Sequence, residues 1–90
     1  MTEEWQVAWD ERALKELKKI DKQAKKDIIG YLKKRISTEE SPRRFGKALV
    51  SNKLGLWHYR IKDYRLICNI EDGNLVVLVL RASQRKNVYE

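Results

Sequence analysis

The sequence predicts an α+β domain, in which a helical hairpin packs on a mainly antiparallel, four-stranded sheet in the order β-α-α-β-β-β. Two observations carry this prediction. Residues 11–36 place apolar side chains at helical spacing, whereas residues 56–89 hold three runs typical of strands, joined by turn residues. A chain of 90 residues is long enough for one small core, so we expect a single domain over residues 1–90.

The N-terminal part predicts one strand followed by two helices. Tryptophan and valine alternate with glutamine and alanine over residues 5–9, the period of a strand that joins the later sheet. Asp10 and Asp21 are placed to cap helices over residues 11–20 and 22–35, because a carboxylate accepts hydrogen bonds from the free amides of a first turn. The stripes expected to face the sheet are Ala13, Leu14, Leu17 and Ile20 on the first helix and Ala24, Ile28, Leu32 and Ile36 on the second.

A basic connection follows the helices. Ser41-Pro42 should close the helical region, because the residue before proline avoids the helical basin. Residues 43–55 then have no strand or helix period, and we expect an irregular connection there. Its anchors would be the apolar side chains Phe45, Leu49 and Leu54.

Three consecutive antiparallel strands are predicted at residues 57–61, 64–71 and 75–80. Asp72-Gly73 is a strong two-residue hairpin signal, since glycine tolerates the positive φ of a type I′ turn. We expect an equally tight turn at Lys62-Asp63. The apolar face of the first two strands would hold Trp57, Tyr59, Ile61, Tyr64, Leu66, Cys68 and Ile70.

A tight turn at Lys62-Asp63 would set Arg60 opposite Arg65 on the open face, with His58 next along. Like charges at opposed positions destabilise a sheet by a few tenths of a kcal/mol up to about 1 kcal/mol. Two interpretations remain open: the arginines splay apart in solvent, or the pair binds an anion.

Basic residues also follow the last strand. Arg81 is expected on the opposite face and has no assigned role, whereas Arg85 should return toward Arg65, followed by Lys86 and Tyr89. A histidine, several cations and a tyrosine that converge on one sheet surface would form a phosphate-binding site with groups for catalysis.

The charge of the chain indicates a polyanionic partner. The net charge is +7; residues 1–42 carry ten Lys or Arg against nine Asp or Glu, and residues 43–86 carry ten against three. A one-sided basic field of this kind is typical of nucleic-acid binding.

Other classes of protein fit poorly. The longest apolar run, residues 75–80, is too short to span a membrane, and the acidic N-terminus lacks a signal-peptide pattern, so we expect a cytoplasmic protein. A single cysteine, Cys68, excludes a disulfide framework and predicts a buried, inert thiol. With no Gly-rich phosphate loop, no Cys/His metal spacing and no pair of catalytic carboxylates in the sequence, we expect neither a metal nor a cofactor.

With this order of elements, and with the segments DERALKELKKI, GKAL, YRIKDYRL and GNLVVLVLRASQRKNVY, the chain resembles the RelE-type toxins of the RelE/ParE toxin–antitoxin superfamily over nearly its whole length. The resemblance implies a ribosome-dependent, metal-independent endoribonuclease that cuts messenger RNA in the decoding site and inhibits translation. It also implies a cognate antitoxin that holds the toxin inactive, and a toxin–antitoxin complex that binds DNA to regulate its own genes.

The resemblance also implies which residues act. The catalytic positions of the family fall on His58 and Arg60, on Arg65, on Arg85 and on Tyr89, which would stack on a base or orient the phosphate. Lysine is usual in the family where this chain has His58, so the identity of the general base stays open. Further RNA or phosphate contacts are expected from Lys62, Lys86, Arg43, Arg44, Lys47 and Lys53.

RNA cleavage without a metal needs a base for the 2′-hydroxyl, a cation at the pentavalent phosphate and an acid for the departing 5′-oxygen. His58 is the one side chain whose unperturbed pKa lies near 7, and a neighbouring Arg60 should favour its neutral form. Arg65 is expected to grip the phosphate bidentately, the alternative being a structural ion pair with Asp63 or Glu71.

Two other functions fit the same residues. A gyrase-inhibiting toxin of the ParE branch would not need these side chains to converge. A plain nucleic-acid-binding module would carry the same basic face without cleavage. Primer extension on a translated message separates the nuclease from the gyrase inhibitor, and growth arrest on induction separates both from the binding module.

Overall fold

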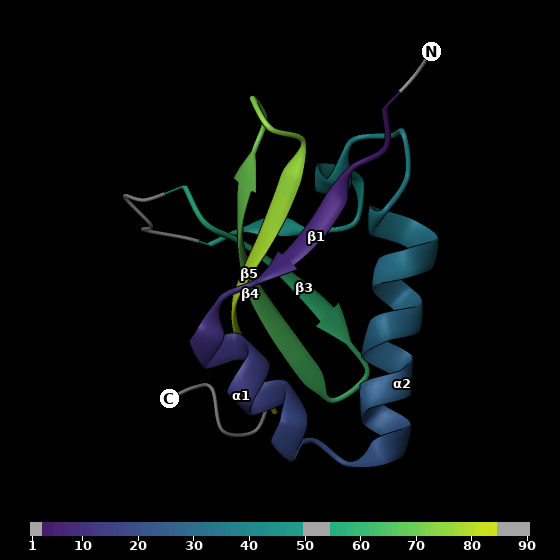
Figure 1. Cartoon of the computed structure of the whole chain (residues 1–90), viewed down its shortest axis with the longest axis vertical. Coiled ribbons are helices and arrows are strands. Elements are labelled where there is room, and N and C mark those ends of the chain that lie inside the picture. Colours follow the sequence, from purple (N-terminus) through teal and green to yellow (C-terminus); the bar gives the residue numbers. More distant parts are fainter. Residues whose placement is uncertain (1–2, 50–54, 85–90) are drawn as a thin grey trace.

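A computed structural model describes residues 3–49 and 55–84 of the chain. The elements along the chain are β1 (Gln6–Trp9), α1 (Glu11–Lys19), α2 (Lys22–Tyr31), β2 (Lys47–Ala48), β3 (Trp57–Ile61), β4 (Tyr64–Glu71) and β5 (Val76–Gln84). The strands form one sheet in the spatial order β1, β5, β4, β3 and β2, and the two helices follow β1 (Figure 1). The α+β class is therefore confirmed, with a fifth strand added to the four that were predicted.

The sheet places the first and last strands side by side. β1 runs parallel to β5, with Val7 opposite Val77 and Trp9 opposite Val79. The other neighbours, β5 with β4, β4 with β3 and β3 with β2, are antiparallel. β5 thus lies between the N-terminal strand and the hairpin that was predicted to carry the site.

The helix starts follow the sequence in one case and depart from it in the other. Asp10 caps α1 as predicted, because its Oδ2 accepts a hydrogen bond from the amide of Arg12 at 3.1 Å. Asp21 stands at the N-cap of α2, but its carboxylate accepts no capping bond, and the predicted side-chain cap is wrong. Its backbone carbonyl accepts from the amide of Lys25 instead, at 2.9 Å.

The second helix ends in a wider turn than predicted. α2 stops at Tyr31, and Leu32–Ile36 form a π-helical turn closed by the Ser37 amide, which donates to the Leu32 carbonyl at 2.8 Å. The expectation of an α-helix to residue 35 is therefore wrong in its last turn. The wider turn keeps Leu32 and Ile36 in the core, as their stripe required.

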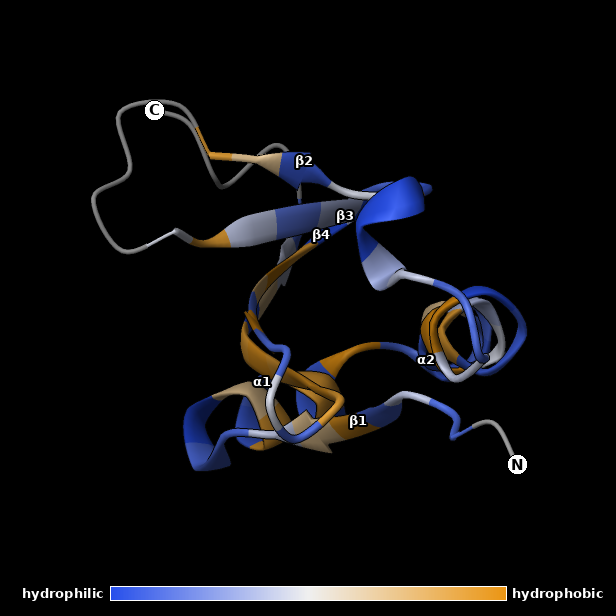
Figure 2. Cartoon of the chain, turned by 90° about the horizontal axis from the view of Figure 1, so that it is seen from above, coloured by the Kyte–Doolittle hydropathy of each residue, from blue (hydrophilic) through white to orange (hydrophobic). Residues whose placement is uncertain are grey.

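The core lies between the sheet and the helices. Figure 2 shows the sheet curving around it, with the hydrophobic side of α2 turned inward. Leu14 is an exception to the predicted stripe: it is 39% exposed, because the short helix α1 packs through Ala13 and Leu17. The Cys68 thiol is buried, as predicted, and burial raises its pKa to about 12, so that it stays protonated. The buried apolar residues are Trp5, Ala13, Leu17, Ile28, Leu32, Ile36, Tyr59, Ile61, Leu66, Cys68, Ile70, Val77, Val79 and Ala82.

The two hairpin turns differ. The Lys62-Asp63 turn is as tight as predicted, with Ile61 paired to Tyr64, and Lys62 takes the positive φ of 53°. The prediction of a two-residue turn at Asp72-Gly73 is wrong: Glu71 pairs with Val76, so residues 72–75 form a four-residue loop. Its positive φ, 54°, falls on Leu75 and not on the glycine.

The last strand is longer than predicted and is bound to α1. β5 continues to Gln84 past an irregularity in its register with β4 at Ile67/Cys68. β1 ends opposite Val79, and beyond it the Glu16 carboxylate accepts from the Ala82 amide at 2.7 Å. Glu16 also accepts from Arg81, at 3.0 Å from Nε and 2.8 Å from Nη2, which gives Arg81 a structural role. Within the described ranges, no helix is both long enough and apolar enough to cross a membrane.

Candidate active site

One wall of the site comes from a strand that was not predicted from the sequence. The predicted irregular connection over residues 43–55 is wrong at its start, where Pro42–Arg44 form a 3-10 helix and β2 follows. β2 pairs with β3, so that Lys47 lies opposite His58. A two-residue strand has no recognisable period, and its alignment depends on contacts with the core.

Those contacts come from a buried tyrosine and a glycine. The Tyr59 hydroxyl donates to the Pro42 carbonyl at 2.6 Å, and burial raises the pKa of Tyr59. Gly46 permits the close approach of β2, because a Cβ there would lie 2.9 Å from Tyr59 Cε1 and 3.2 Å from the His58 carbonyl oxygen. The position of Lys47 is therefore set by the core beneath it.

A hollow of about 280 Å³ opens above these strands. Arg60 lies opposite Arg65 in the β3–β4 register, as predicted, and His58 lies on the same face of β3. Lys47 enters from β2, and Phe45 completes the wall. The hollow thus brings four of the predicted residues, Lys47, His58, Arg60 and Arg65, to one surface.

His58 is poised to be neutral. Burial lowers its pKa below the usual 6.5, and the positive charges of Arg65 and Lys47 lower it further. The direction agrees with the prediction, but the charged neighbours responsible are Arg65 and Lys47 in place of Arg60. The buried Nδ1 of the ring has no hydrogen-bond partner, and an unsatisfied buried polar atom in a native fold calls for an explanation, such as a catalytic role.

The cations around His58 carry unbalanced charge. In the part of the chain that the structure describes, no carboxylate pairs with Lys47, Arg60 or Arg65. The alternative of an ion pair between Arg65 and Asp63 or Glu71 therefore finds no counterpart there. Three cations beside a neutral imidazole form a surface that can bind a phosphate group and accept a proton next to it.

Three other predicted phosphate contacts are bound to carboxylates outside the hollow. The Arg43 guanidinium holds Asp72 with two hydrogen bonds of 2.9 and 2.8 Å, and its Cζ lies 5.6 Å from the ring centroid of Trp57. This pair ties the 3-10 helix to the loop between β4 and β5. The remaining two pairs are Arg44 with Glu40, and Lys62 with Asp27 at 3.1 Å from Nζ to Oδ2.

Some predicted residues lie outside the described residues. These are Lys53, Arg85, Lys86 and Tyr89, and their roles stay predictions. The residue that sequence reasoning missed is Phe45, which it treated as an apolar anchor. The available signal was its place between two arginines and the Gly46-Lys47 pair, in a basic segment that follows a proline.

Comparisons with known proteins match a toxin family by sequence and toxin structures by fold. The family described as the ParE toxin of the type II toxin–antitoxin system, parDE, matches residues 7–89. A chain of the RelBE2 toxin–antitoxin complex of Mycobacterium tuberculosis is similar, with a TM-score of 0.81 and 26% identity over 94% of this chain and 95% of that chain.

Two further structures share the fold. The isolated E. coli RelE toxin has a TM-score of 0.72 and 26% identity over 89% of this chain and 83% of that chain. The archaeal RelE–RelB complex of Pyrococcus horikoshii has a TM-score of 0.71 and 24% identity over 94% and 97%. A comparison of the sequence with curated proteins finds no match.

Proposed function

We propose that this chain, which belongs to the RelE/ParE superfamily of type II toxins, is a ribosome-dependent endoribonuclease that cuts messenger RNA and so inhibits translation. One observation carries the proposal. A histidine with a lowered pKa, His58, stands among three cations without carboxylate partners in the described residues, Lys47, Arg60 and Arg65. A toxin that acts by protein contact alone would not need this combination.

The arrangement suggests a sequence of steps. Neutral His58 takes the proton of the ribose 2′-hydroxyl, and the 2′-oxygen attacks the adjacent phosphorus. The bond from phosphorus to the 5′-oxygen breaks, which leaves a 2′,3′-cyclic phosphate on one fragment and a 5′-hydroxyl on the other. Arg60 and Arg65 stabilise the added negative charge, and the ammonium of Lys47, beside His58, is the candidate donor of the proton to the leaving oxygen.

The buried Nδ1 of His58 has a further consequence. A neutral imidazole offers one nitrogen as acceptor and one as donor. Because Nδ1 is covered by the protein, Nε2 is the nitrogen that can reach a ligand in the hollow. Two residues outside the described ranges remain part of the proposal: Arg85 as one of the implied catalytic positions, and Tyr89 to stack on a base or orient the phosphate.

A reconstituted translation system tests the proposed activity. Purified toxin is added to ribosomes stalled on a defined message, and primer extension locates any new 5′ ends. We expect cleavage that requires ribosomes. Cleavage should continue when a chelator is added at a concentration that leaves the ribosomes intact. An intact message under conditions in which the toxin arrests growth would overturn the nuclease proposal.

We further propose a cognate antitoxin with an acidic, amphipathic segment that covers the hollow, and a toxin–antitoxin complex that binds DNA to regulate its own genes. Relatives have been crystallised as RelB–RelE complexes. The net charge of +7 favours an acidic partner, so association should slow steeply as salt rises while dissociation changes little. Stopped-flow mixing at several salt concentrations measures both rates, and a salt-independent association rate would contradict this proposal.

A second candidate is inhibition of DNA gyrase, which the matching ParE family description favours. It predicts that the purified chain blocks plasmid supercoiling by gyrase, and that substitution of His58 leaves this block intact. The supercoiling assay with wild type and His58→Gln distinguishes the two functions.

A further inference from the structure

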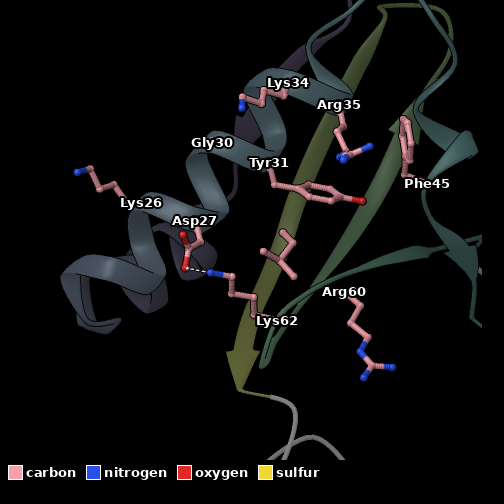
Figure 3. A pocket seen from close by; sticks show the side chains of 10 residues that line it. Lys26, Asp27, Gly30, Tyr31, Lys34, Arg35, Phe45, Arg60 and Lys62 are labelled. Atoms are coloured by element: carbon pink, nitrogen blue, oxygen red, sulfur yellow. Dashed lines mark ion pairs between the residues drawn. The ribbon is translucent and has the colours of Figure 1, made fainter.

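A second and larger hollow adjoins the candidate active site. It is a groove of about 590 Å³ between α2 and β3. Figure 3 shows its aromatic wall, with the ring of Tyr31 directed from α2 toward the side of the groove where Phe45 stands. Tyr31 in turn packs edge-on against buried Tyr59, with 6.3 Å between the ring centroids. The groove therefore rests on the same core residue that positions β2.

The groove carries excess positive charge. Lys62 and Asp27 pair with each other across it, as the dashed line in Figure 3 shows. The other cations that line it are exposed, and over residues 3–49 and 55–84 none of them has a carboxylate within ion-pair distance. These cations are Lys26, Lys34, Arg35 and Arg60.

Arg35 is held by the aromatic wall. Its Cζ lies 5.1 Å from the ring centroid of Phe45 and 5.9 Å from that of Tyr31. Contact with two rings orients the guanidinium without neutralising it. A planar cation next to aromatic rings is the arrangement on which nucleobases stack in proteins that bind single strands, with phosphates held by nearby lysines.

The groove lies next to the candidate active site, because Phe45 and Arg60 line both hollows. We propose that the groove is a subsite for single-stranded RNA, which holds nucleotides flanking the scissile phosphate. A base would stack on Phe45 and Arg35, and Lys34 would bind the phosphate that follows. This inference rests on the proposed function, since it assigns the substrate path to and from the same site.

An acidic protein segment is the rival occupant. It would also be attracted by the cations, but it would bring no planar bases to stack beside Arg35 and its two aromatic rings. The aromatic wall therefore favours RNA over an acidic peptide.

The test compares two double substitutions of equal charge. Lys34→Ala/Arg35→Ala removes two groove cations, and Lys18→Ala/Lys19→Ala removes two exposed cations from the last turn of α1. Fluorescence anisotropy measures the Kd of labelled, uncleavable 2′-O-methyl RNA of about four and about ten nucleotides, lengths within the range of single-strand binding sites. Thermal melting of each variant verifies folding.

We expect the wild type and the α1 variant to bind the longer RNA more tightly, and the groove variant to lose that gain, about tenfold in Kd. The slope of log Kd against log salt should fall by about 0.7 in the groove variant, the size expected for the one lost phosphate contact of Lys34. Phe45→Leu keeps the charge. It should reduce the difference in Kd between the longer and the shorter RNA and leave the salt dependence of Kd unchanged.

Three results would overturn the subsite. An equal loss of RNA affinity in the two double variants would indicate that only the total charge matters. If the groove variant still bound the longer RNA more tightly than the shorter one by the wild-type factor, the RNA would lie elsewhere. If the groove variant bound RNA as the wild type does but bound a synthetic, glutamate-rich amphipathic peptide more weakly, the groove would be assigned to a protein partner. Because anisotropy does not depend on cleavage, these outcomes are distinct from a failure of the nuclease proposal, which primer extension with wild type reveals.

Discussion

The basic residues of this small protein fall into two groups. Arg43, Arg44, Lys62 and Arg81 each hold a carboxylate, and the pairs tie the 3-10 helix, the turns and α1 to the rest of the fold. Lys47, Arg60 and Arg65 surround His58, and in the described ranges they hold none. Net charge alone does not distinguish the two groups. The presence or absence of a carboxylate partner does, and it suggests which cations stabilise the fold and which can bind a ligand.

Arg65→Ala should give the largest loss of cleavage, about 10²–10³-fold, the size found when a fixed donor is removed from developing charge. Its melting temperature should hold or rise slightly, because a like-charge pair with Arg60 is relieved. The matched control is Arg43→Ala, which should lower the melting temperature and keep cleavage. Single-turnover cleavage and thermal melts measure both. A reversal of the two patterns would show that the grouping of cations is mistaken.

His58→Gln should slow single-turnover cleavage by about 10²-fold, as expected for a lost general base. In the wild type the rate should rise with pH through a pKa below 6.5 and level off near neutrality, whereas the variant should lack that rise. Because the folded pKa is lowered, stability should fall as pH decreases through 6.5, and the variant should lose this dependence. A loss below tenfold would leave His58 as a binding residue.

Gly46→Ala should reduce cleavage by about tenfold while the other site residues remain. The new Cβ would meet Tyr59 and the His58 backbone, so β2 must shift and carry Lys47 and Phe45 with it. Overpacking of this kind costs about 1–3 kcal/mol of stability. Rates corrected for the folded fraction measure the effect, and Gly30→Ala, where a Cβ meets nothing within 4 Å, is the control. An unchanged cleavage rate in Gly46→Ala would show that the position of β2 does not matter for cleavage.

Glu16→Ala should leave cleavage per folded molecule unchanged and lower stability by about 2 kcal/mol, since it removes a charged acceptor from Arg81 and Ala82. Burial raises the pKa of Glu16, but the hydrogen bonds from Arg81 and Ala82 outweigh it and the net pKa is lowered. Its contribution should therefore be lost as pH falls through that lowered pKa. Denaturant titration measures the loss of stability, and Glu3→Ala, at an exposed position, is the control. Equal unfolding midpoints for the two variants would contradict the structural role given to Glu16.

The parts predicted well from the sequence have local causes. Alternation over residues 57–61 and the tight turn at Lys62-Asp63 determine the Arg60–Arg65 register, because a slip of one residue would move the apolar set to the open face. The loop at residues 72–75 was mispredicted because Asp72-Gly73 fits a type I′ turn, while the register of β5 with β4 places the positive φ on Leu75. Tertiary pairing outweighed the local turn preference.

The candidate site was predicted where it lies on β3 and β4 and missed where it depends on distant contacts. Lys47 was one of several basic residues in an apparently irregular segment, and only the bond from Tyr59 to Pro42 and the fit of Gly46 place it beside His58. The sequence also did not show which cations have carboxylate partners, because the partners are distant along the chain. Asp72 is 29 residues from Arg43, and Glu16 is 65 residues from Arg81.

The parallel pairing of β1 with β5 bears on how the protein is made. Residues 6–9 find their place only beside residues 76–79, so the sheet cannot close until most of the chain has left the ribosome that synthesises it. Until then the strands that carry His58 and Arg65 lack the neighbour that completes their core. If the chain acts on ribosomes as proposed, a growing chain is not yet active against the ribosome that makes it, and the proposed antitoxin can bind the protein once the sheet has closed.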